Sequence, residues 1–130
     1  MSKKVERAKE LRSGTCGNYN CAQAVLIPTA EEKGLTQEDA AKLAKYFGTG
    51  MKIGSTCGAV TGGLMVLGLS DASEETVAEY LKTLQERHGG CLDCPALLKR
   101  NQEQVRLDKK VHCDGMIFEC IELAEELLAK

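Results

Sequence analysis

The chain has 130 residues, of which 43% are hydrophobic and only 4% are aromatic, and its net charge is −2. This length suits a single domain, spanning residues 1–130, with one modest core. Charges of both signs are spread along the chain and no segment approaches the roughly 20 apolar residues that cross a bilayer, so we expect no nucleic acid and no membrane among its partners.

The first predicted helices lie in the opening part of the chain. The stretch "MSKKVERAKELRSG" is basic but lacks the apolar run of a secretory signal, so the expected location is cytoplasmic. Apolar residues recur at helical spacing within it, which predicts a short amphipathic helix. A second helix is expected after a cap at Asn18 or Asn20, with its end at Gly34.

A third helix is predicted from Thr36, which with Asp39 three residues later forms the pattern of a capping box. Its apolar side is expected to include Leu43, and the glycines Gly48 and Gly50 are expected to end it.

The second half of the chain continues in helices. A buried helix is expected over 55–69, and another from a cap at Ser73. A short helix should begin at Pro95, a polar return segment should lie within 99–110, and the last helix should open at Cys113. No segment alternates like a half-buried strand. The expected fold is therefore all-α, a single-domain bundle of about six or seven helices.

Cysteine is the unusual component, with seven residues in the chain. An odd number cannot all pair within one chain, and cytosolic cysteines bind metals or react more often than they form structural bridges. Unpaired N–H groups and the helix dipole favour a thiolate at a helix start, and thiolates are both nucleophiles and metal ligands. Four cysteines occupy predicted helix starts and so indicate either a metal or cluster site or a set of reactive thiols: Cys21, Cys57, Cys94 and Cys113.

The stretch "GSTCGAVTGG", residues 54–63, combines one of these cysteines with four glycines. Gly58 and Gly62 lie on one face of the predicted helix and cost helix stability, which indicates that space is needed there. We predict that Gly58 and Gly62 bind a cofactor; close packing against another helix is the alternative.

The other cysteines fit different roles. Cys120 lies in the apolar stripe of the last helix and is expected in the core. Cys91 forms a C-x-x-C pair with Cys94, which suits a redox pair or two ligands of one metal. Cys16 is expected in a loop as an accessory thiol. Two histidines lie beside cysteines and are candidates to tune a thiolate or to bind a metal: His88 and His112.

Several of these segments resemble the C_GCAxxG_C_C family, whose members are described as redox-active proteins with a shared quartet of cysteines. The resemblance runs from about residue 5 to residue 128 and is carried by "NCAQAVL" (20–26), "CGAVTGGLMVLGL" (57–69) and the cysteine before the acidic C-terminal helix. It implies redox or cluster chemistry, with Cys91 as the alternative to Cys94 at the third position. The quartet carries over to Cys21, Cys57, Cys94 and Cys113.

We expect the quartet to bind an iron–sulfur cluster for electron transfer with a redox partner protein, because four cysteine thiolates hold such clusters. The alternatives are a thiol–disulfide oxidoreductase, a structural zinc site and a helical interaction module. No residue is assigned a catalytic role. Broad apolar helix faces are compatible with a homodimer. In an up-and-down bundle the second, fourth and sixth helices begin at one end, and the return segment would bring the start of the last helix to the same end.

Overall fold

The structure is a computed structural model that describes residues 2–13, 19–105 and 107–130. Within these residues it is helical and contains no β-strand, only an isolated bridge, so the predicted all-α class is confirmed. Two five-residue wide turns, η1 (Gly50–Gly54) and η2 (Asn101–Val105), interrupt the helices. The α-helices are α1 (Lys3–Arg12), α2 (Cys21–Glu32), α3 (Gln37–Ala44), α4 (Gly58–Leu69), α5 (Glu74–Arg87), α6 (Cys94–Arg100) and α7 (Lys109–Leu128).

Three helices begin at polar caps that the sequence predicts. Asn20 caps α2, and its side chain accepts a hydrogen bond from the Gln23 N–H at 2.9 Å. The side chains of Thr36 and Ser73 cap α3 and α5 in the same way. A side-chain oxygen at the cap satisfies an N–H group that the first helical turn leaves unpaired. Asn18, the other candidate cap for α2, lies outside the described residues.

The predicted extent of the third helix was wrong. α3 ends at Ala44 and does not continue to Gly48. Its buried residues are Ala40 and Ala44, whereas Leu43 is 59% exposed. The reason is that α3 packs mainly against α2, so only a narrow face of small side chains is covered.

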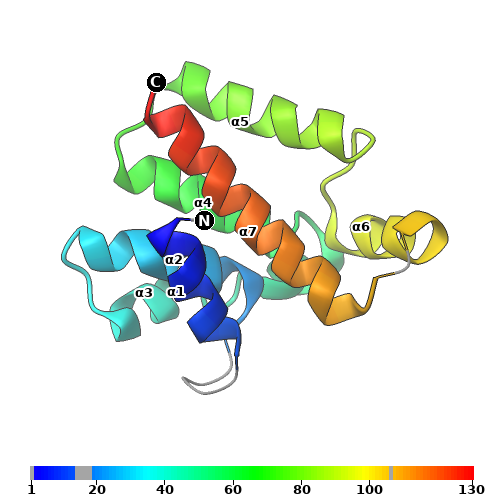
Figure 1. Cartoon of the computed structure of the whole chain (residues 1–130), viewed down its shortest axis with the longest axis horizontal. Helices are drawn as coiled ribbons and strands as arrows, with labels where there is room; N and C mark the ends of the chain where they lie inside the picture. The colour runs from blue at the N-terminus through cyan, green and yellow to red at the C-terminus, as the bar shows by residue number, and fades with distance from the viewer. Residues whose placement is uncertain (1, 14–18, 106) are drawn as a thin grey trace.

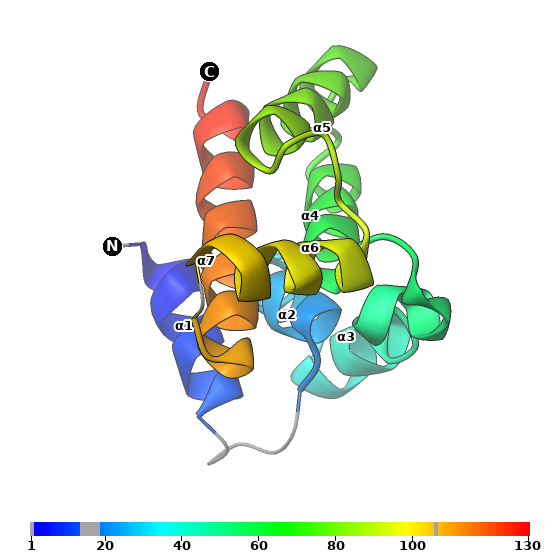
Figure 2. The same ribbon diagram turned by 90° about the vertical axis from the view of Figure 1, so that its right-hand side faces the viewer.

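The centre of the molecule is formed by α2, α4 and α7, which pack against one another. α1 and α3 flank α2, and α5 lies on the outer side of α4 and α7 (Figure 1). α6 crosses in front of the first half of α7 when the molecule is turned (Figure 2). The main hydrophobic cluster joins residues of α4, α5 and α7, and a second cluster joins α2 and α3. These contacts fix α2 and α4 relative to α7, whereas α6 contacts η1 and η2.

Glycines in α4 allow unusually close helix packing. A Cβ atom at Gly62 would lie 2.8 Å from the Ala22 backbone oxygen and 2.9 Å from the Val25 Cβ. A Cβ atom at Gly63 would lie 2.6 Å from the Cζ atom of Tyr80, whose buried hydroxyl donates a hydrogen bond to the Val60 oxygen at 3.1 Å. The glycines thus let α2 and Tyr80 contact the α4 backbone.

The predicted return segment lies between α6 and α7. α6 ends at Arg100, η2 follows, and α7 begins at Lys109. The buried Asn101 side chain closes this connection, because its Nδ2 atom donates to the Leu107 oxygen at 2.8 Å and its Oδ1 atom accepts from the Leu107 N–H at 3.2 Å. The turn therefore depends on one side chain.

Replacing Asn101 with alanine should destabilise the protein by about 1–3 kcal/mol, because both hydrogen bonds to Leu107 are lost. Urea denaturation measures the change in the free energy of unfolding. Gln102→Ala, at the exposed neighbouring position, is the matched control and should have little effect. Equal losses in the two variants would contradict this role for Asn101.

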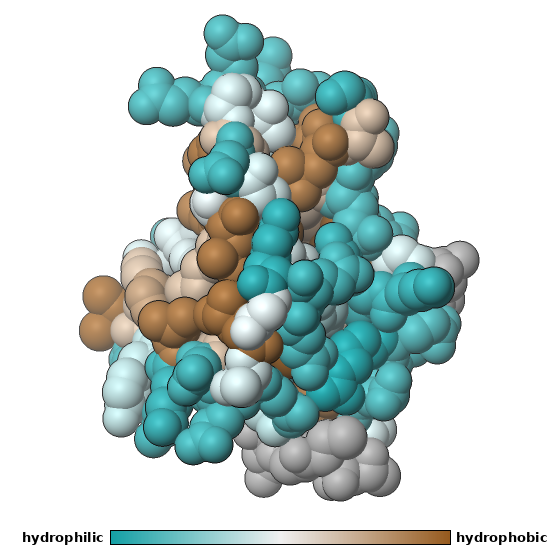
Figure 3. Space-filling model, turned by 90° about the vertical axis from the view of Figure 1, so that its left-hand side faces the viewer, coloured by the Kyte–Doolittle hydropathy of each residue, from teal (hydrophilic) through white to brown (hydrophobic). Residues whose placement is uncertain are grey.

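No helix in the described ranges combines the length and the apolar character that crossing a bilayer requires. Apolar side chains do reach the surface: Figure 3 shows an oblique band of them on the face that forms the left-hand side of Figure 1. The large apolar residues that are most exposed are Ile53, Tyr46 and Leu43. Such exposed side chains are compatible with the predicted homodimer, which stays a prediction.

Candidate functional site: four thiols at the junction of four segments

The structure brings the four predicted cysteines together. Cys21 and Cys94 are the first residues of α2 and α6, and Cys57 is the N-cap of α4. The Cys113 thiol, on α7, interacts electrostatically with the other three, and Cys57 also interacts with Cys21 and with Cys94. We call these four residues the cysteine quartet.

The beginnings of α2 and α4 meet because a glycine follows Cys57. A Cβ atom at Gly58 would lie 3.3 Å from the Cys21 Cβ and 3.2 Å from the Ala22 nitrogen. Gly58 and Gly62 therefore face α2, which is the packing role that the sequence left open for them. Their predicted role in binding a cofactor stays a prediction.

A backbone bridge brings Cys57 and Cys94 side by side. The Cys57 N–H donates to the Leu92 oxygen at 2.7 Å, and the Cys94 N–H donates to the Ser55 oxygen at 2.8 Å. These two bonds flank an antiparallel bridge between Thr56 and Asp93. One isolated bridge leaves no alternation in the sequence, so pattern analysis could not find it.

The predicted position of Cys113 at a helix start was wrong. α7 begins at Lys109, so Cys113 is its fifth residue and lies in the second turn. The residues from Lys109 to His112 include no glycine or proline that would stop the helix. Asp108 takes the N-cap position instead.

The thiols of Cys113 and Cys21 form the most polarised pair of the site. A side-chain hydrogen bond with Cys21, aided by the positive charges of Arg12 and Lys109, lowers the pKa of Cys113 to about 7. The same hydrogen bond, together with burial, raises the pKa of Cys21. The proton is thus lost first from Cys113 and retained by Cys21, which can donate it to the Cys113 thiolate.

The expectation that a helix start lowers the pKa was wrong for Cys57 and Cys94. Burial raises the pKa of Cys57 more than the backbone N–H groups of Ala59 and Val60 lower it. Burial, and then the nearby Cys113, raise the pKa of Cys94. Desolvation disfavours the charged form of a thiol, and at these two positions it outweighs the helix N-terminus.

Sequence reasoning missed the charged residues around Cys113. Arg12, at the end of α1, donates from Nε to Asp114 Oδ1 at 2.7 Å and from a terminal nitrogen to the Tyr19 oxygen at 2.8 Å. Both side chains of the Arg12–Asp114 pair are more than four-fifths buried. The two residues are 102 positions apart, so no local pattern indicates their contact.

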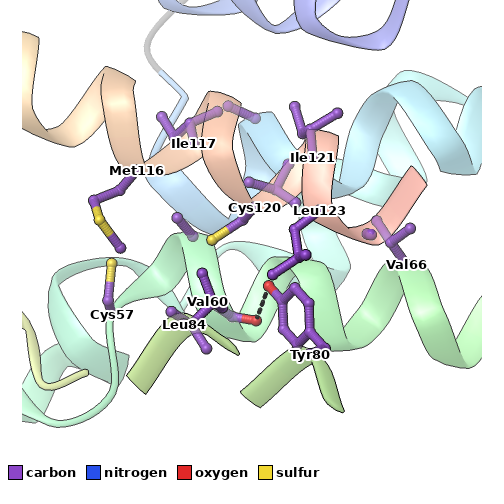
Figure 4. Close-up of a cluster of buried hydrophobic side chains, with 14 of the residues drawn as sticks. Cys57, Val60, Val66, Tyr80, Leu84, Met116, Ile117, Cys120, Ile121 and Leu123 are labelled. Carbon is purple, nitrogen blue, oxygen red and sulfur yellow. Dashed lines mark hydrogen bonds between the residues drawn. The ribbon is translucent and has the colours of Figure 1, made fainter. Parts of the chain in front are cut away.

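The other three cysteines, Cys16, Cys91 and Cys120, lie outside the quartet. Cys120 is fully buried, as predicted for the core, and burial raises its pKa. Figure 4 shows it on α7 among apolar side chains, with Tyr80 nearby and with Met116 reaching toward Cys57. Cys94, rather than Cys91, is the thiol that interacts with Cys57 and Cys113, which favours Cys94 as the third member of the quartet. Cys16 lies outside the described residues.

The histidines lie near each other on α7 and at the end of α5. His88 Nε2 is 2.8 Å from Glu119 Oε1. Burial, and then the nearby His88, lower the pKa of His112. Their predicted roles, tuning a thiolate or binding a metal, stay predictions.

The donor chemistry of the quartet fits a metal centre in kind, because four thiolates bind zinc and iron–sulfur clusters. Within residues 2–13, 19–105 and 107–130, however, no three His, Cys, Asp or Glu side chains are arranged to hold a metal ion. The four cysteines as metal ligands therefore stay a prediction.

The comparisons with known proteins identify a family. No curated protein and no solved structure matches the chain. A family model described as "Putative redox-active protein (C_GCAxxG_C_C)" matches residues 19–127, a range that includes the whole quartet. Because this match covers most of the sequence, the chain belongs to the C_GCAxxG_C_C family.

Proposed function

We propose that the protein is a thiol–disulfide redox protein in which Cys113 is the attacking thiol and Cys21 the resolving thiol. The proposal rests on the pairing of these two side chains at the junction of α2 and α7, because the interaction with Cys21, together with Arg12 and Lys109, lowers the pKa of Cys113 to about 7. A thiol with a pKa near the ambient pH combines a large thiolate fraction with high nucleophilicity.

The proposed reaction is the reduction of a disulfide on a partner. The Cys113 thiolate attacks one sulfur of the partner's disulfide, forms a mixed disulfide and releases the other sulfur as a thiolate. Cys21 loses its proton and attacks the Cys113 sulfur, which breaks the mixed disulfide. The partner's two thiolates take up the proton that Cys21 loses and one proton from solvent, so the partner gains two electrons and two protons as a dithiol, and Cys21 and Cys113 become a disulfide.

An iron–sulfur cluster is the second candidate, and the gathering of all four thiols favours it. Cys21, Cys57, Cys94 and Cys113 would hold the cluster, which would supply one-electron transfer. A structural zinc ion on the same thiols is the third possibility. For both the dithiol function and the cluster function we propose that the protein exchanges electrons with a redox partner protein. We also propose that it forms a homodimer.

Purification under anaerobic conditions separates the candidates. The dithiol function predicts a colourless, metal-free protein that loses a pair of free thiols under a mild disulfide oxidant and regains them with a dithiol reductant. A brown protein with iron and acid-labile sulfide would replace this proposal with the cluster. A colourless protein with stoichiometric zinc and no thiol exchange would overturn both redox versions.

Serine variants then identify the sulfurs involved. Cys21→Ser should abolish the reversible loss of paired thiols, because the resolving sulfur is missing, whereas Cys120→Ser should retain it because Cys120 is a buried core residue. Quantitative thiol titration before and after oxidation measures the difference. If the protein contains iron, Cys57→Ser should abolish iron binding and Cys120→Ser should not. Equal reversible thiol loss in Cys21→Ser and Cys120→Ser would contradict the dithiol function, and equal iron binding in Cys57→Ser and Cys120→Ser would contradict the cluster function.

A further inference from the structure

A cavity of about 380 Å³ lies between the end of α5, α6 and α7. Figure 2 shows these three elements together, with α6 crossing in front of α7 and the end of α5 above them. The volume lies within the range of small-molecule binding sites. Neither the family description nor the quartet chemistry assigns a role to this cavity.

The polar wall of the cavity is positively charged, although the chain has a net charge of −2. Arg87, Arg100, His88 and His112 line it together with a single carboxylate, Glu119. Glu119 is already paired, because Arg87 lies 3.1 Å from its Oε2 and His88 lies 2.8 Å from its Oε1. Two guanidinium groups against one carboxylate leave an excess positive charge, even with both imidazoles neutral.

Of the two arginines that line the cavity, Arg100 is the one without a partner among the residues that the structure describes. Its side chain is half-buried, lies beside Gly89, and makes no ion pair or hydrogen bond with any part of the chain that the structure describes. A partly desolvated guanidinium without a carboxylate is unfavourable. The planar fork of an arginine is also the group that proteins use to bind carboxylates and phosphates through paired hydrogen bonds.

The cavity also has an apolar lining. Leu97 and Met116 are buried, and Val111 and Leu107 form its more exposed edge. A ligand that contacted both the charged and the apolar lining would need an anionic head and an aliphatic body. An inorganic ion alone would leave the apolar wall uncovered.

We propose that this cavity binds a small organic anion, with its acidic head on Arg100 and its aliphatic body against Leu97 and Met116. Met116 lines the cavity, and in Figure 4 its side chain reaches toward Cys57. Met116 therefore separates the proposed anion from Cys57. The proposal concerns binding alone and does not rest on the redox chemistry of the thiols.

The test uses the reduced, full-length protein and sodium hexanoate as the probe, in a buffer without carboxylate, phosphate or sulfonate. Isothermal titration calorimetry should show saturable binding at one site, and hexanoate should shift the NMR signals of the His88 and His112 rings. 1-Hexanol, which has the same body without the charge, should bind at least about tenfold more weakly. Inorganic phosphate, which lacks the apolar body, should also bind more weakly than hexanoate.

Variants at Arg100 decide the role of the charge. Arg100→Gln should weaken hexanoate binding by at least about tenfold, and Arg100→Lys should lose less because it keeps a positive charge. Lys99→Gln, which removes a charge from an exposed neighbour on α6, is the matched control and should bind like the wild type. Thermal unfolding confirms that each variant is folded.

Three results would overturn the proposal. These are equal binding of hexanol and hexanoate, equal affinities of Arg100→Gln and Lys99→Gln, or no saturable binding of hexanoate at millimolar concentration. Zinc chloride serves as a separate probe, and a zinc-induced shift of both histidine signals without any hexanoate effect would assign the cavity to a cation instead. A failed thiol function would leave these measurements unaffected.

Discussion

Replacing Gly62 with alanine will destabilise the protein by about 1–3 kcal/mol, whereas the same substitution at Gly68 will stabilise it by up to about 1 kcal/mol. Both glycines lie within α4, so the intrinsic gain in helix propensity is the same. The two positions differ in their surroundings. A Cβ atom at Gly62 would lie 2.8 Å from the Ala22 backbone oxygen, and a Cβ atom at Gly68 has no neighbour within 4 Å.

The opposite signs make this pair a sharp test of the close packing between α2 and α4. Urea denaturation at neutral pH gives both free energies of unfolding under identical conditions. Because α2 carries Cys21 and α4 begins after Cys57, Gly62→Ala should also separate the two halves of the quartet, while Gly68→Ala should leave it intact. Stabilisation by Gly62→Ala would show that α2 does not approach α4 in the way described.

In the reduced, metal-free protein, the rate of alkylation of Cys113 by iodoacetamide will rise with pH through a midpoint near pH 7. The thiolate is the reacting form, so the rate follows its fraction and levels off above the pKa. At pH 7 about half of Cys113 is ionised, compared with a few per cent of an ordinary cysteine, which makes Cys113 roughly tenfold richer in thiolate. Cys120, buried and with a raised pKa, should react more slowly by orders of magnitude.

Mass spectrometry of the peptides after brief labelling measures each cysteine separately. Cys21→Ala removes the hydrogen bond that is the main cause of the low pKa, so the midpoint for Cys113 should move up toward that of an ordinary thiol. Cys120→Ala should leave the midpoint in place. An unchanged midpoint in Cys21→Ala would mean that the pair is not coupled as described.

The local signals in the sequence were enough to predict much of the fold. The polar caps at Asn20, Thr36 and Ser73 mark helix starts because each satisfies backbone groups within its own turn. In an up-and-down bundle successive helices run in opposite directions, so α2, α4 and α6 are predicted to begin at the same end of the bundle. The start of α7 was misplaced, because Asp108 and Cys113 are both followed by residues that can continue a helix.

The features that complete the site depend on contacts between distant segments. The bridge of Thr56 with Asp93 and the pairing of Arg12 with Asp114 involve single residues far apart in the chain. Neither contact creates a periodic pattern, so neither can be recognised before the helices are packed. The low pKa of Cys113 follows mainly from its contact with Cys21, and then from Arg12 and Lys109, and not from the helix start that the sequence argument assumed for it.

The contact between Cys21 on α2 and Cys113 on α7 makes the maturation of the protein depend on the docking of α7. The quartet is divided among the beginnings of α2, α4 and α6 and the second turn of α7, so a nascent chain that ends before α7 cannot form the Cys21–Cys113 contact. Until α7 docks, Cys113 lacks its contact with Cys21, so its lowered pKa appears only when α7 packs against the rest of the molecule. The acidity of Cys113 is in this way switched on by the docking of α7, and a thiol-reactive dye could follow that event in time.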